Sequence, residues 1–234
     1  MGAKVLVGCP TYDRFEYCLD EYAEVIKNLS YPDYDVLLVD DSKTDEYCQR
    51  IKSKGIPAVR IKYDEEPKKP IMRIVAGRDR LKAEVLNKGY DYLLFIDQDV
   101  IPPKDIIEKL LRHNKKMISG IYYKTATMVY RDKKGAVVKK KEAPLPMIFG
   151  YLSGVKDKMR TISAEDVKES RLMKIRSCGT GCLLIHRDVL EKVNFRWLEE
   201  TGASEDTCFC TDALNAGFEI FADTSVKCKH LDDS

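Results

Sequence analysis

Long hydrophobic runs are missing from this sequence of 234 residues. The longest apolar stretches, such as residues 93–96 and 182–185, fall far short of the roughly 20 residues that a helix needs to cross a bilayer. Low-complexity segments and internal repeats are missing as well, and the hydrophobic content of 44% is ordinary for a globular protein. We therefore expect a folded chain with neither a membrane span nor extended disorder.

An excess of charge of one sign is also missing. Lys and Arg number 40 against 38 Asp and Glu, so the formal net charge is +2. Because the molecule as a whole carries little charge, nothing attracts it to nucleic acid in general, and we expect no nucleic-acid partner. The first residues lead directly into a strand pattern with no apolar signal region, which predicts a cytoplasmic protein.

Cysteine, by contrast, is well represented, with eight residues. Several of them lie inside apolar strand or helix patterns, where a reduced thiol behaves as a small hydrophobic side chain, so we interpret them as mainly free thiols. A zinc or redox protein is an alternative, although the spacings do not repeat as a paired zinc knuckle. The cysteines that such a protein would use are Cys178, Cys182, Cys208, Cys210 and Cys228.

The first 122 residues alternate short apolar runs with helical patterns. Strands are predicted at residues 4–9, 35–40, 58–63, 92–96 and 117–122, and helices at residues 15–29, 44–54, 73–87 and 103–114. Further along, the patterns predict strands at 178–185, 218–222 and 225–229, and helices at 187–193 and from Ser204 to just before Gly217. This alternation predicts an α/β fold in which helices flank a mainly parallel, mixed sheet.

The alternation breaks down between about residues 124 and 176. This segment contains fourteen Lys and Arg against six Asp and Glu, a balance of +8, and it also contains the apolar stretch 144–152. Such a segment is either an interaction surface or a solvated hairpin, and the sequence leaves both interpretations open.

Polar residues follow three of the predicted strands. They are Pro10-Thr11-Tyr12-Asp13, Asp40-Asp41-Ser42 and Asp97-Gln98-Asp99. Ligands of open α/β sheets bind outside the carboxyl ends of the strands, so these residues predict a common crevice. Two carboxylates one residue apart suit Mg²⁺ or Mn²⁺ bridging a diphosphate, whereas three ordinary turns are the alternative.

The order of these motifs resembles family 2 glycosyltransferases of the GT-A fold. The match also includes Ala76-Gly77-Arg78-Asp79, Glu205-Asp206-Thr207-Cys208-Phe209 and His230. The resemblance implies one Rossmann-like GT-A domain over residues 1–234. It divides into a nucleotide-binding half at about 1–123, the basic insertion at about 124–176 and an acceptor-side half at about 177–234. The implied reaction is an inverting, Mn²⁺- or Mg²⁺-dependent transfer of sugar from a nucleoside-diphosphate sugar to an acceptor hydroxyl.

The resemblance also implies roles for individual residues on the donor side. The nucleotide sugar would contact Pro10, Tyr12, Asp41, Arg78 and Asp97, and the metal would be held by Asp99 and His230 with Asp97 beside them. Simpler interpretations are a helix-capping role for Asp41 and a surface pair with Asp79 for Arg78.

Two further features are interpreted from their residue types alone. Gly179-Thr180-Gly181 lets the backbone approach the donor sugar closely, or is a glycine-rich turn. Trp197, the sole tryptophan, either stacks on a sugar at the acceptor side or anchors the core.

The mechanistic prediction concerns Asp206. An acceptor hydroxyl becomes a good nucleophile when a positioned carboxylate takes its proton, and Asp206 matches the family's base. Glu205 is assigned to the acceptor side, with Ser204 as the predicted N-cap of the helix. The alternative is that both acids only stabilise the helix N-terminus.

Two other functions compete with glycosyl transfer. A sugar-1-phosphate nucleotidyltransferase ranks second, because such enzymes usually carry a glycine-rich loop with arginine and lysine after the first strand, where this sequence has Gly8-Cys9-Pro10. A non-catalytic sugar-nucleotide-binding protein is the other. We leave the acceptor open between a saccharide, a lipid-linked molecule and a protein, and expect peripheral membrane contact through the basic insertion and its apolar stretch.

Overall fold

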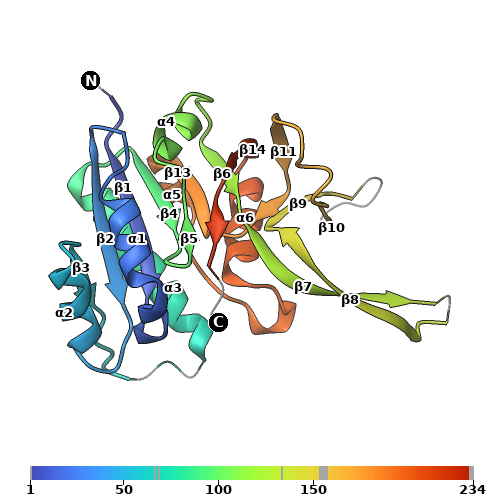
Figure 1. Ribbon diagram of the computed structural model, residues 1–234, viewed down its shortest axis with the longest axis horizontal. Coiled ribbons are helices and arrows are strands. Elements are labelled where there is room, and N and C mark those ends of the chain that lie inside the picture. The colour runs from blue at the N-terminus through green and yellow to red at the C-terminus, as the bar shows by residue number, and fades with distance from the viewer. Residues whose placement is uncertain (1, 66, 68, 133, 153–157, 232–234) are drawn as a thin grey trace.

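The computed structural model describes residues 2–65, 67, 69–132, 134–152 and 158–231. Its central sheet has eight strands in the order β11-β14-β6-β13-β4-β1-β2-β3 (Figure 1). These strands are β1 (Val5–Thr11), β2 (Tyr34–Asp40), β3 (Ala58–Arg60), β4 (Tyr92–Ile96), β6 (Met117–Ile121), β11 (Leu172–Ile175), β13 (Cys182–His186) and β14 (Ile220–Lys227).

Strand directions divide the sheet into two parts. Strands β4, β1, β2 and β3 run parallel to one another, and β14 runs parallel to β6. Strand β13 lies antiparallel between β4 and β6, and β11 is antiparallel to β14. The sheet is therefore mixed and mostly parallel, and the predicted fold class is confirmed.

Both faces of the sheet are covered, because successive strand residues point to opposite sides. From β1, Val5 and Val7 pack into the core formed with α1 (Leu19–Ile26), α2 (Glu46–Ser53) and α4 (Ile106–Leu111). Leu6 packs into the opposite core, with α3 (Pro70–Lys88), α5 (Arg187–Lys192) and α6 (Glu205–Asn215). Figure 1 shows the resulting three layers, with α1 in front of the sheet.

Local sequence signals fix most helix positions. Helix α3 begins with Pro70 at its first turn and ends at Gly89, whose φ of 73° is the left-handed conformation that glycine adopts without strain. The helix predicted at residues 15–29 begins instead as a 3₁₀ helix, η1 (Asp13–Cys18), and continues as α1. The helices predicted at 44–54 and 103–114 are present but shorter, as α2 and α4.

Three strand predictions need correction. The strand predicted at 58–63 ends at Arg60. The strand predicted at 178–185 is divided into β12 (Ser177–Cys178) and β13 by the glycine-containing turn. The two strands predicted at 218–222 and 225–229 are one long strand, β14, followed by β15 (Lys229–His230), which pairs with β5 (Val100–Ile101).

The break predicted at residues 223–224 is a register shift against β6 between Ala222 and Lys227, and the strand itself continues because its polar residues find partners. Thr224 donates its hydroxyl to the Glu169 carbonyl and its N–H to the Arg171 carbonyl, and both bonds are to the segment beside the strand. A buried polar residue that is hydrogen-bonded in this way is compatible with a sheet interior.

The basic insertion contains strands that the sequence patterns did not predict. Strands β7 (Tyr123–Arg131) and β8 (Val137–Pro146) form a hairpin that projects from the body of the molecule (Figure 1). Strands β9 (Ile148–Tyr151), β10 (Met159–Thr161) and β12 form a small sheet at its base. Positions 133 and 153–157 of the predicted insertion lie outside the described residues.

The apolar stretch 144–152, which the membrane prediction invoked, is partly buried, with Pro144, Tyr151 and Leu152 exposed at its two ends. Pro146, Ile148 and Gly150 are buried at the base of the hairpin and in β9. Within the described part of the chain, no helix is both long and apolar enough to cross a membrane. All eight cysteines are buried free thiols, as predicted.

Candidate active site

The carboxyl ends of β1, β2 and β4 open onto one cavity of about 290 Å³. Residues from α3, α6 and the start of the β7–β8 hairpin complete its walls. Most of the predicted site residues line it, namely Pro10, Tyr12, Asp41, Arg78, Asp97, Asp99, Thr180, Glu205 and Asp206. The common crevice predicted from three polar strand ends is therefore present.

The middle residue of Asp97-Gln98-Asp99 positions the two acids. The Gln98 amide is buried, donates to the Phe15 carbonyl at 2.8 Å and accepts hydrogen bonds from Thr11 and Tyr47. These bonds hold the Gln98 side chain in the protein interior, outside the cavity lining. The carboxylates of Asp97 and Asp99, on either side of it in the sequence, line the cavity.

The nucleotide side of the cavity lies between β1 and β2, where Pro10 pairs in register with Val39. Tyr12 lies edge-on against Phe15, with its ring centroid 5.2 Å away, and is 38% exposed. The Asp41 carboxylate accepts a hydrogen bond from Arg73 at 3.1 Å. Asp41 is thus not the cap of α2; the N-cap position of that helix belongs to Asp45.

Arg78 is buried at the floor of the cavity, with 4% of its surface exposed, and does not form the surface pair with Asp79 that was the simpler interpretation. Helix α3 can approach β1 here because Gly77 has no side chain: an added Cβ would lie 2.8 Å from the Pro10 Cβ. The guanidinium lies over the Phe95 ring at 4.9 Å, and its Nη1 has no hydrogen-bond partner among the described residues. A buried, unpartnered cationic donor is suited to an anionic or hydroxyl-bearing ligand.

Arg78 also connects the donor and acceptor sides. Its Nη2 lies 3.2 Å from the Glu205 Oε1 and 4.0 Å from the Asp97 Oδ1. Burial would lower the pKa of Arg78, but the charges of Asp97, Glu205 and Asp206 raise it overall, so the guanidinium stays protonated. Burial raises the pKa of Asp97, and the Arg78 charge opposes that rise.

Asp206 is held at the start of α6. Its Oδ1 accepts from the Thr207 N–H at 2.7 Å and from the Ser204 hydroxyl. Ser204 occupies the predicted N-cap position, but its hydroxyl contacts Asp206 and Thr207 side chains and not a helix N–H. Oδ2 makes no hydrogen bond within the described part of the chain, which leaves that oxygen of a fixed carboxylate available to a ligand.

Asp99 and His230 meet although they are far apart in sequence. The pairing of β15 with β5 brings the His230 Nε2 to 3.2 Å from the Asp99 Oδ2, and both residues line a smaller pocket that shares Tyr12 and Phe15 with the main cavity. The Asp99 Oδ1 is buried without a hydrogen-bond partner among the described residues. One imidazole nitrogen and one carboxylate with an unsatisfied oxygen fit a divalent cation such as Mn²⁺.

The predicted three-residue metal set is not formed. Among residues 2–65, 67, 69–132, 134–152 and 158–231, no group of three or more His, Cys, Asp or Glu side chains could hold a metal ion. Asp97 lies 4.0 Å from Arg78, whereas Asp99 and His230 lie 3.2 Å from each other. Among the described residues the cysteines of the zinc alternative come together only as pairs. The sulfurs of Cys182 and Cys228 lie 3.7 Å apart, and the Cys210 thiol donates to the Cys178 carbonyl at 3.7 Å.

Tyr122 is a site residue that sequence patterns missed, because it ends an apolar strand. Its hydroxyl accepts from the Gly181 N–H at 3.3 Å, and its ring stacks near His230 at 6.2 Å. Burial and the charges of Asp97 and Asp206 raise the pKa of Tyr122, so the phenol stays neutral. Gly179 does not line the cavity; a side chain there would collide with the Tyr122 ring.

Lys124, Arg73 and Met147 were also missed although they line the cavity. Lys124 lies two residues after the strand predicted at 117–122, so a search for polar residues near strand ends would have included it. Trp197, which was predicted at the acceptor side, lies outside the cavity lining. It packs partly buried against the core, with the Lys69 ammonium 5.3 Å from its ring.

The sequence matches the pattern of glycosyl transferase family 2 over residues 7–193, which is most of the chain and includes the β1, β2 and β4 ends and Arg78. The chain belongs to glycosyl transferase family 2. As a family 2 glycosyltransferase it transfers a sugar from a nucleotide sugar, which decides against the nucleotidyltransferase and zinc-protein alternatives. A comparison with curated proteins gave no match.

Solved structures share the fold at low sequence identity. A197 from STIV has 18% identity and a TM-score of 0.54, with 98% of this chain and 86% of A197 covered. TarS 1-349 of S. aureus, in complex with UDP-GlcNAc, has 13% identity and a TM-score of 0.55, covering 99% and 60%. The mannosyltransferase PcManGT from Pyrobaculum calidifontis, in complex with GDP-Man and Mn²⁺, has 13% identity and a TM-score of 0.59, covering 98% and 57%. The last two proteins extend well beyond the region that this chain matches.

Proposed function

We propose that this family 2 glycosyltransferase is metal-dependent and inverting, and that it moves a sugar from a nucleoside-diphosphate sugar to an acceptor hydroxyl. The observation that supports this most is the single cavity onto which Asp97, Asp99, Arg78 and Asp206 converge from β4, α3 and α6. Such a cavity offers groups for a diphosphate at one side and a carboxylate for proton transfer at the other.

Asp206 is the proposed base. Its Oδ1 is fixed by Ser204 and Thr207, so the carboxylate cannot rotate freely, and its Oδ2 makes no hydrogen bond within the described residues, which leaves it available to a ligand. An acceptor hydroxyl that donates to this oxygen loses its proton as the new glycosidic bond forms. Attack from the side opposite the diphosphate inverts the anomeric carbon.

Glu205 is a weaker candidate for the base, because its carboxylate is buried and bonded to Arg78. In this arrangement Arg78 binds the donor through its unpartnered Nη1, and Glu205 holds the guanidinium in place. Asp97, which faces the same guanidinium, is the proposed acceptor of a hydrogen bond from a donor-sugar hydroxyl.

Asp99 and His230 would hold a Mn²⁺ or Mg²⁺ ion. When bound, the ion neutralises the charge that develops on the departing nucleoside diphosphate. On the nucleotide side, Pro10 and Tyr12 would border the base, and Asp41 would hydrogen-bond it while Arg73 holds the carboxylate. Thr180, buried in the wall beside Asp97, would contact the donor sugar.

The test is a panel of nucleotide sugars screened by thermal stabilisation with and without Mn²⁺, followed by donor hydrolysis for the best ligand. We expect metal-dependent stabilisation and hydrolysis, both lost in Asp99→Asn. An Asp188→Asn variant, changed at the exposed start of α5, is the control and retains both. Donor binding without any metal-dependent turnover would instead indicate a non-catalytic sugar-nucleotide-binding protein.

A further inference from the structure

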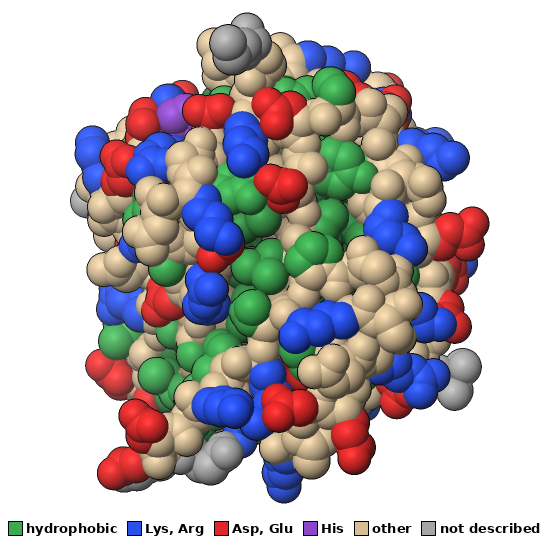
Figure 2. All heavy atoms as spheres, turned by 90° about the vertical axis from the view of Figure 1, so that its left-hand side faces the viewer, with side chains coloured by type: hydrophobic (Ala, Val, Ile, Leu, Met, Phe, Trp, Pro, Cys, Tyr) green, Lys and Arg blue, Asp and Glu red, His purple; other side chains and the backbone are tan. Residues whose placement is uncertain are grey.

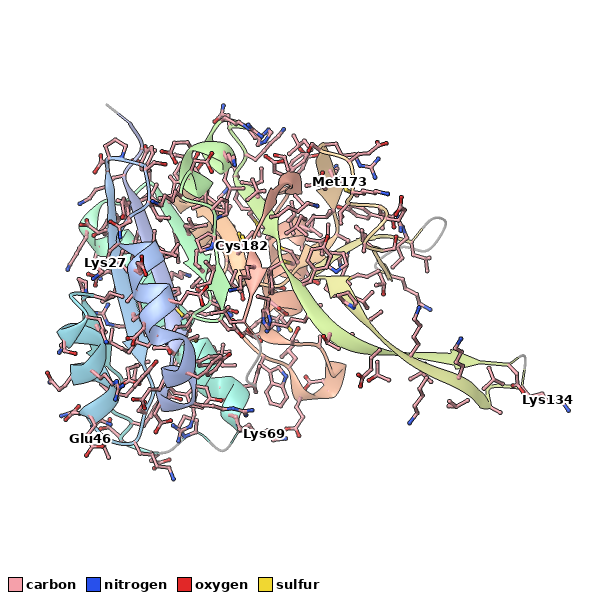
Figure 3. The ribbon with its side chains drawn as sticks, viewed as in Figure 1. Lys27, Glu46, Lys69, Lys134, Met173 and Cys182 are labelled. Carbon is pink, nitrogen blue, oxygen red and sulfur yellow. The ribbon has the colours of Figure 1, made fainter. Side chains whose placement is uncertain are left out.

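The β7–β8 hairpin has no packing role that explains its composition. Its two strands pair with each other over nine registered positions and form a sheet of their own. The described residues from Val137 to Glu142 are all exposed. Figures 1 and 3 show the hairpin extending away from the body, with Lys134 labelled near its tip. Its outer half is therefore a surface and not part of the core.

The charge of this outer half is of one sign. Residues 129–141 contain six Lys and Arg and one acid, a balance of +5. That acid, Asp132, accepts from the backbone N–H groups of Lys134 and Ala136, so it stabilises the turn. Within the described residues, no ion pair joins Lys139, Lys140 or Lys141 to an acid. These three consecutive lysines point alternately to both faces of the strand.

Valine side chains are exposed beside the lysines. Val129 is 44%, Val137 46% and Val138 64% exposed. Val138 lies at the register irregularity of the hairpin, where an extra residue is pushed out of the ladder. By contrast, the side of the molecule opposite the hairpin carries acidic and basic side chains interspersed (Figure 2). Clustered lysines with exposed aliphatic side chains match an anionic bilayer surface, which offers both negative headgroups and an apolar interior.

The hairpin is directly connected to the catalytic cavity. Strand β7 begins next to Lys124, which lines the cavity, and five residues further along the strand is Val129. At about 3.4 Å per residue, this places Val129 roughly 17 Å from Lys124. The spacing fits an acceptor whose sugar part extends that far from a membrane.

We propose that the outer half of the β7–β8 hairpin binds an anionic lipid bilayer and thereby presents the cavity to an acceptor anchored in that bilayer. The first part rests on the hairpin alone, and the second part rests on the proposed function. The contact surface is Val129, Val137, Val138 and Lys139 to Lys141, at the opposite end of β8 from the buried stretch 146–150.

The test of membrane binding is sedimentation of the full chain with vesicles of phosphatidylcholine alone or mixed equally with phosphatidylglycerol. We expect binding to the mixed vesicles only, weakened by added salt. The triple variant Lys139→Ala, Lys140→Ala, Lys141→Ala should bind roughly 100-fold more weakly. The control variant Lys43→Ala, Lys62→Ala, Lys104→Ala removes the same charge from three exposed loop positions outside the hairpin. It should bind the mixed vesicles as the parent does.

A second variant tests the apolar contribution. Val137→Ser with Val138→Ser retains all charges and should weaken binding to mixed vesicles roughly tenfold. Circular dichroism melting serves as the folding check for every variant, since the changed residues are exposed. Equal binding by the lysine variant and its control, or binding to polyuridylate in place of vesicles, overturns the proposal. So does aggregation of the lysine variant with unchanged vesicle affinity, because the lysines would then only protect the strand edges.

Donor hydrolysis without vesicles separates this inference from the proposed function. The hairpin variants should hydrolyse donor at the parent rate, because their changed residues lie outside the cavity. Loss of hydrolysis in the parent would overturn the proposed function and leave membrane binding standing. Donor hydrolysis by a parent protein that does not bind the mixed vesicles would overturn the membrane inference and leave the proposed function standing.

Discussion

The Arg78 guanidinium lies 3.2 Å from the Glu205 carboxylate and joins α3 to the first turn of α6. Both side chains are almost completely buried, at 5% and 7% exposure. The pair thus connects the helix behind the donor strands to the helix that carries the proposed base. Its geometry links the stability of the fold to the position of Asp206.

Removing one member of this pair leaves an uncompensated buried charge. We expect Glu205→Ala to lower the free energy of unfolding by about 3–5 kcal/mol, whereas Arg78→Met with Glu205→Leu should recover much of that loss. The exposed pair Lys174 and Glu219 is the control, for which breaking the contact should cost about 1 kcal/mol or less. Urea unfolding measures the free energy of unfolding of all variants. If the effects of Arg78→Met alone and Glu205→Leu alone add up to the effect of the double variant, the two residues are not coupled.

Asp206→Asn should abolish proton transfer without removing the side chain. We expect kcat to fall by roughly 10²- to 10⁴-fold with the donor Kd unchanged, because a neutral amide does not accept the proton. The control is Asp212→Asn on the same helix, which breaks a surface pair with Arg196 and should keep kcat. If Asp206→Asn is active and Glu205→Gln folds but is inactive, the base is Glu205.

His230→Asn should weaken the metal site. We expect the affinity of Mn²⁺ in the presence of a nucleoside diphosphate to fall at least tenfold, since the Asp99 carboxylate loses its partner ligand. The matched control is His186→Asn. His186 is the last residue of β13, contacts Lys116 and does not line either pocket of the site. Calorimetric titration measures the affinity, and equal values for both variants would exclude His230 as a ligand.

Gly77→Ala reverses the usual effect of this substitution in a helix. Alanine has the higher helix propensity by about 1 kcal/mol, but its Cβ would lie 2.8 Å from the Pro10 Cβ. We expect a net loss of about 1–3 kcal/mol in unfolding free energy, together with weaker donor binding. Asn87→Ala, at an exposed position of the same helix, should instead be neutral or slightly stabilising. Thermal unfolding of the two variants provides the comparison, and a stabilising Gly77→Ala would show that α3 has room to move.

Asp223 should make stability depend on pH in the acid range. Burial alone would raise the pKa of this carboxyl, but hydrogen bonds from Ser225, His113 and Arg112 lower it from 3.8 to about 2. A depressed folded pKa stabilises the protein fully above the unfolded pKa, and this contribution is lost as the pH falls from about 4 to 2. The loss is on the order of 2 kcal/mol, since the Asp223 side chain is 2% exposed.

The matching variant is Asp223→Asn. Its unfolding free energy should be lower than the parent's at pH 7 and should change less between pH 4 and pH 2. Denaturant unfolding at a series of pH values measures this slope, with the exposed Asp64→Asn as a control that keeps the parent slope. Identical slopes for parent and Asp223→Asn would mean that other carboxylates dominate acid unfolding.

Predictability from sequence differs between the two halves of the chain. Strands β1, β2, β4 and β6 are short apolar runs between amphipathic helices, and their periodicity was sufficient to place them. Strands β7 and β8 were not found, because in β8 the alternation is interrupted by lysines on both faces and by proline, and β9 to β11 were not found because they are only three or four residues long. A hairpin that buries neither face has no hydrophobic pattern to detect.

The candidate site divides in a similar way. Asp97, Asp99, Arg78 and Asp206 were identified from motifs, and the structure brings them to one cavity. Trp197 lies outside the cavity lining and packs partly buried against the core, which agrees with the second of its two interpretations and leaves its acceptor-side role a prediction. Tyr122 had no signal at all, since a tyrosine that ends an apolar strand is indistinguishable from a core residue.

By itself the sequence determined the helices, the parallel strands and the acids at their carboxyl ends, because these depend on periods of about 3.6 and 2 residues and on the neighbours of each residue along the chain. Only the tertiary structure decided that β15 pairs with β5 and brings His230 to Asp99, that Arg78 is buried against Glu205, and that the basic segment leaves the body as a hairpin. The contacts of His230 with Asp99 and of Arg78 with Glu205 join residues separated by more than a hundred positions. They depend on which of several compatible surfaces meet, and a local pattern does not contain that information.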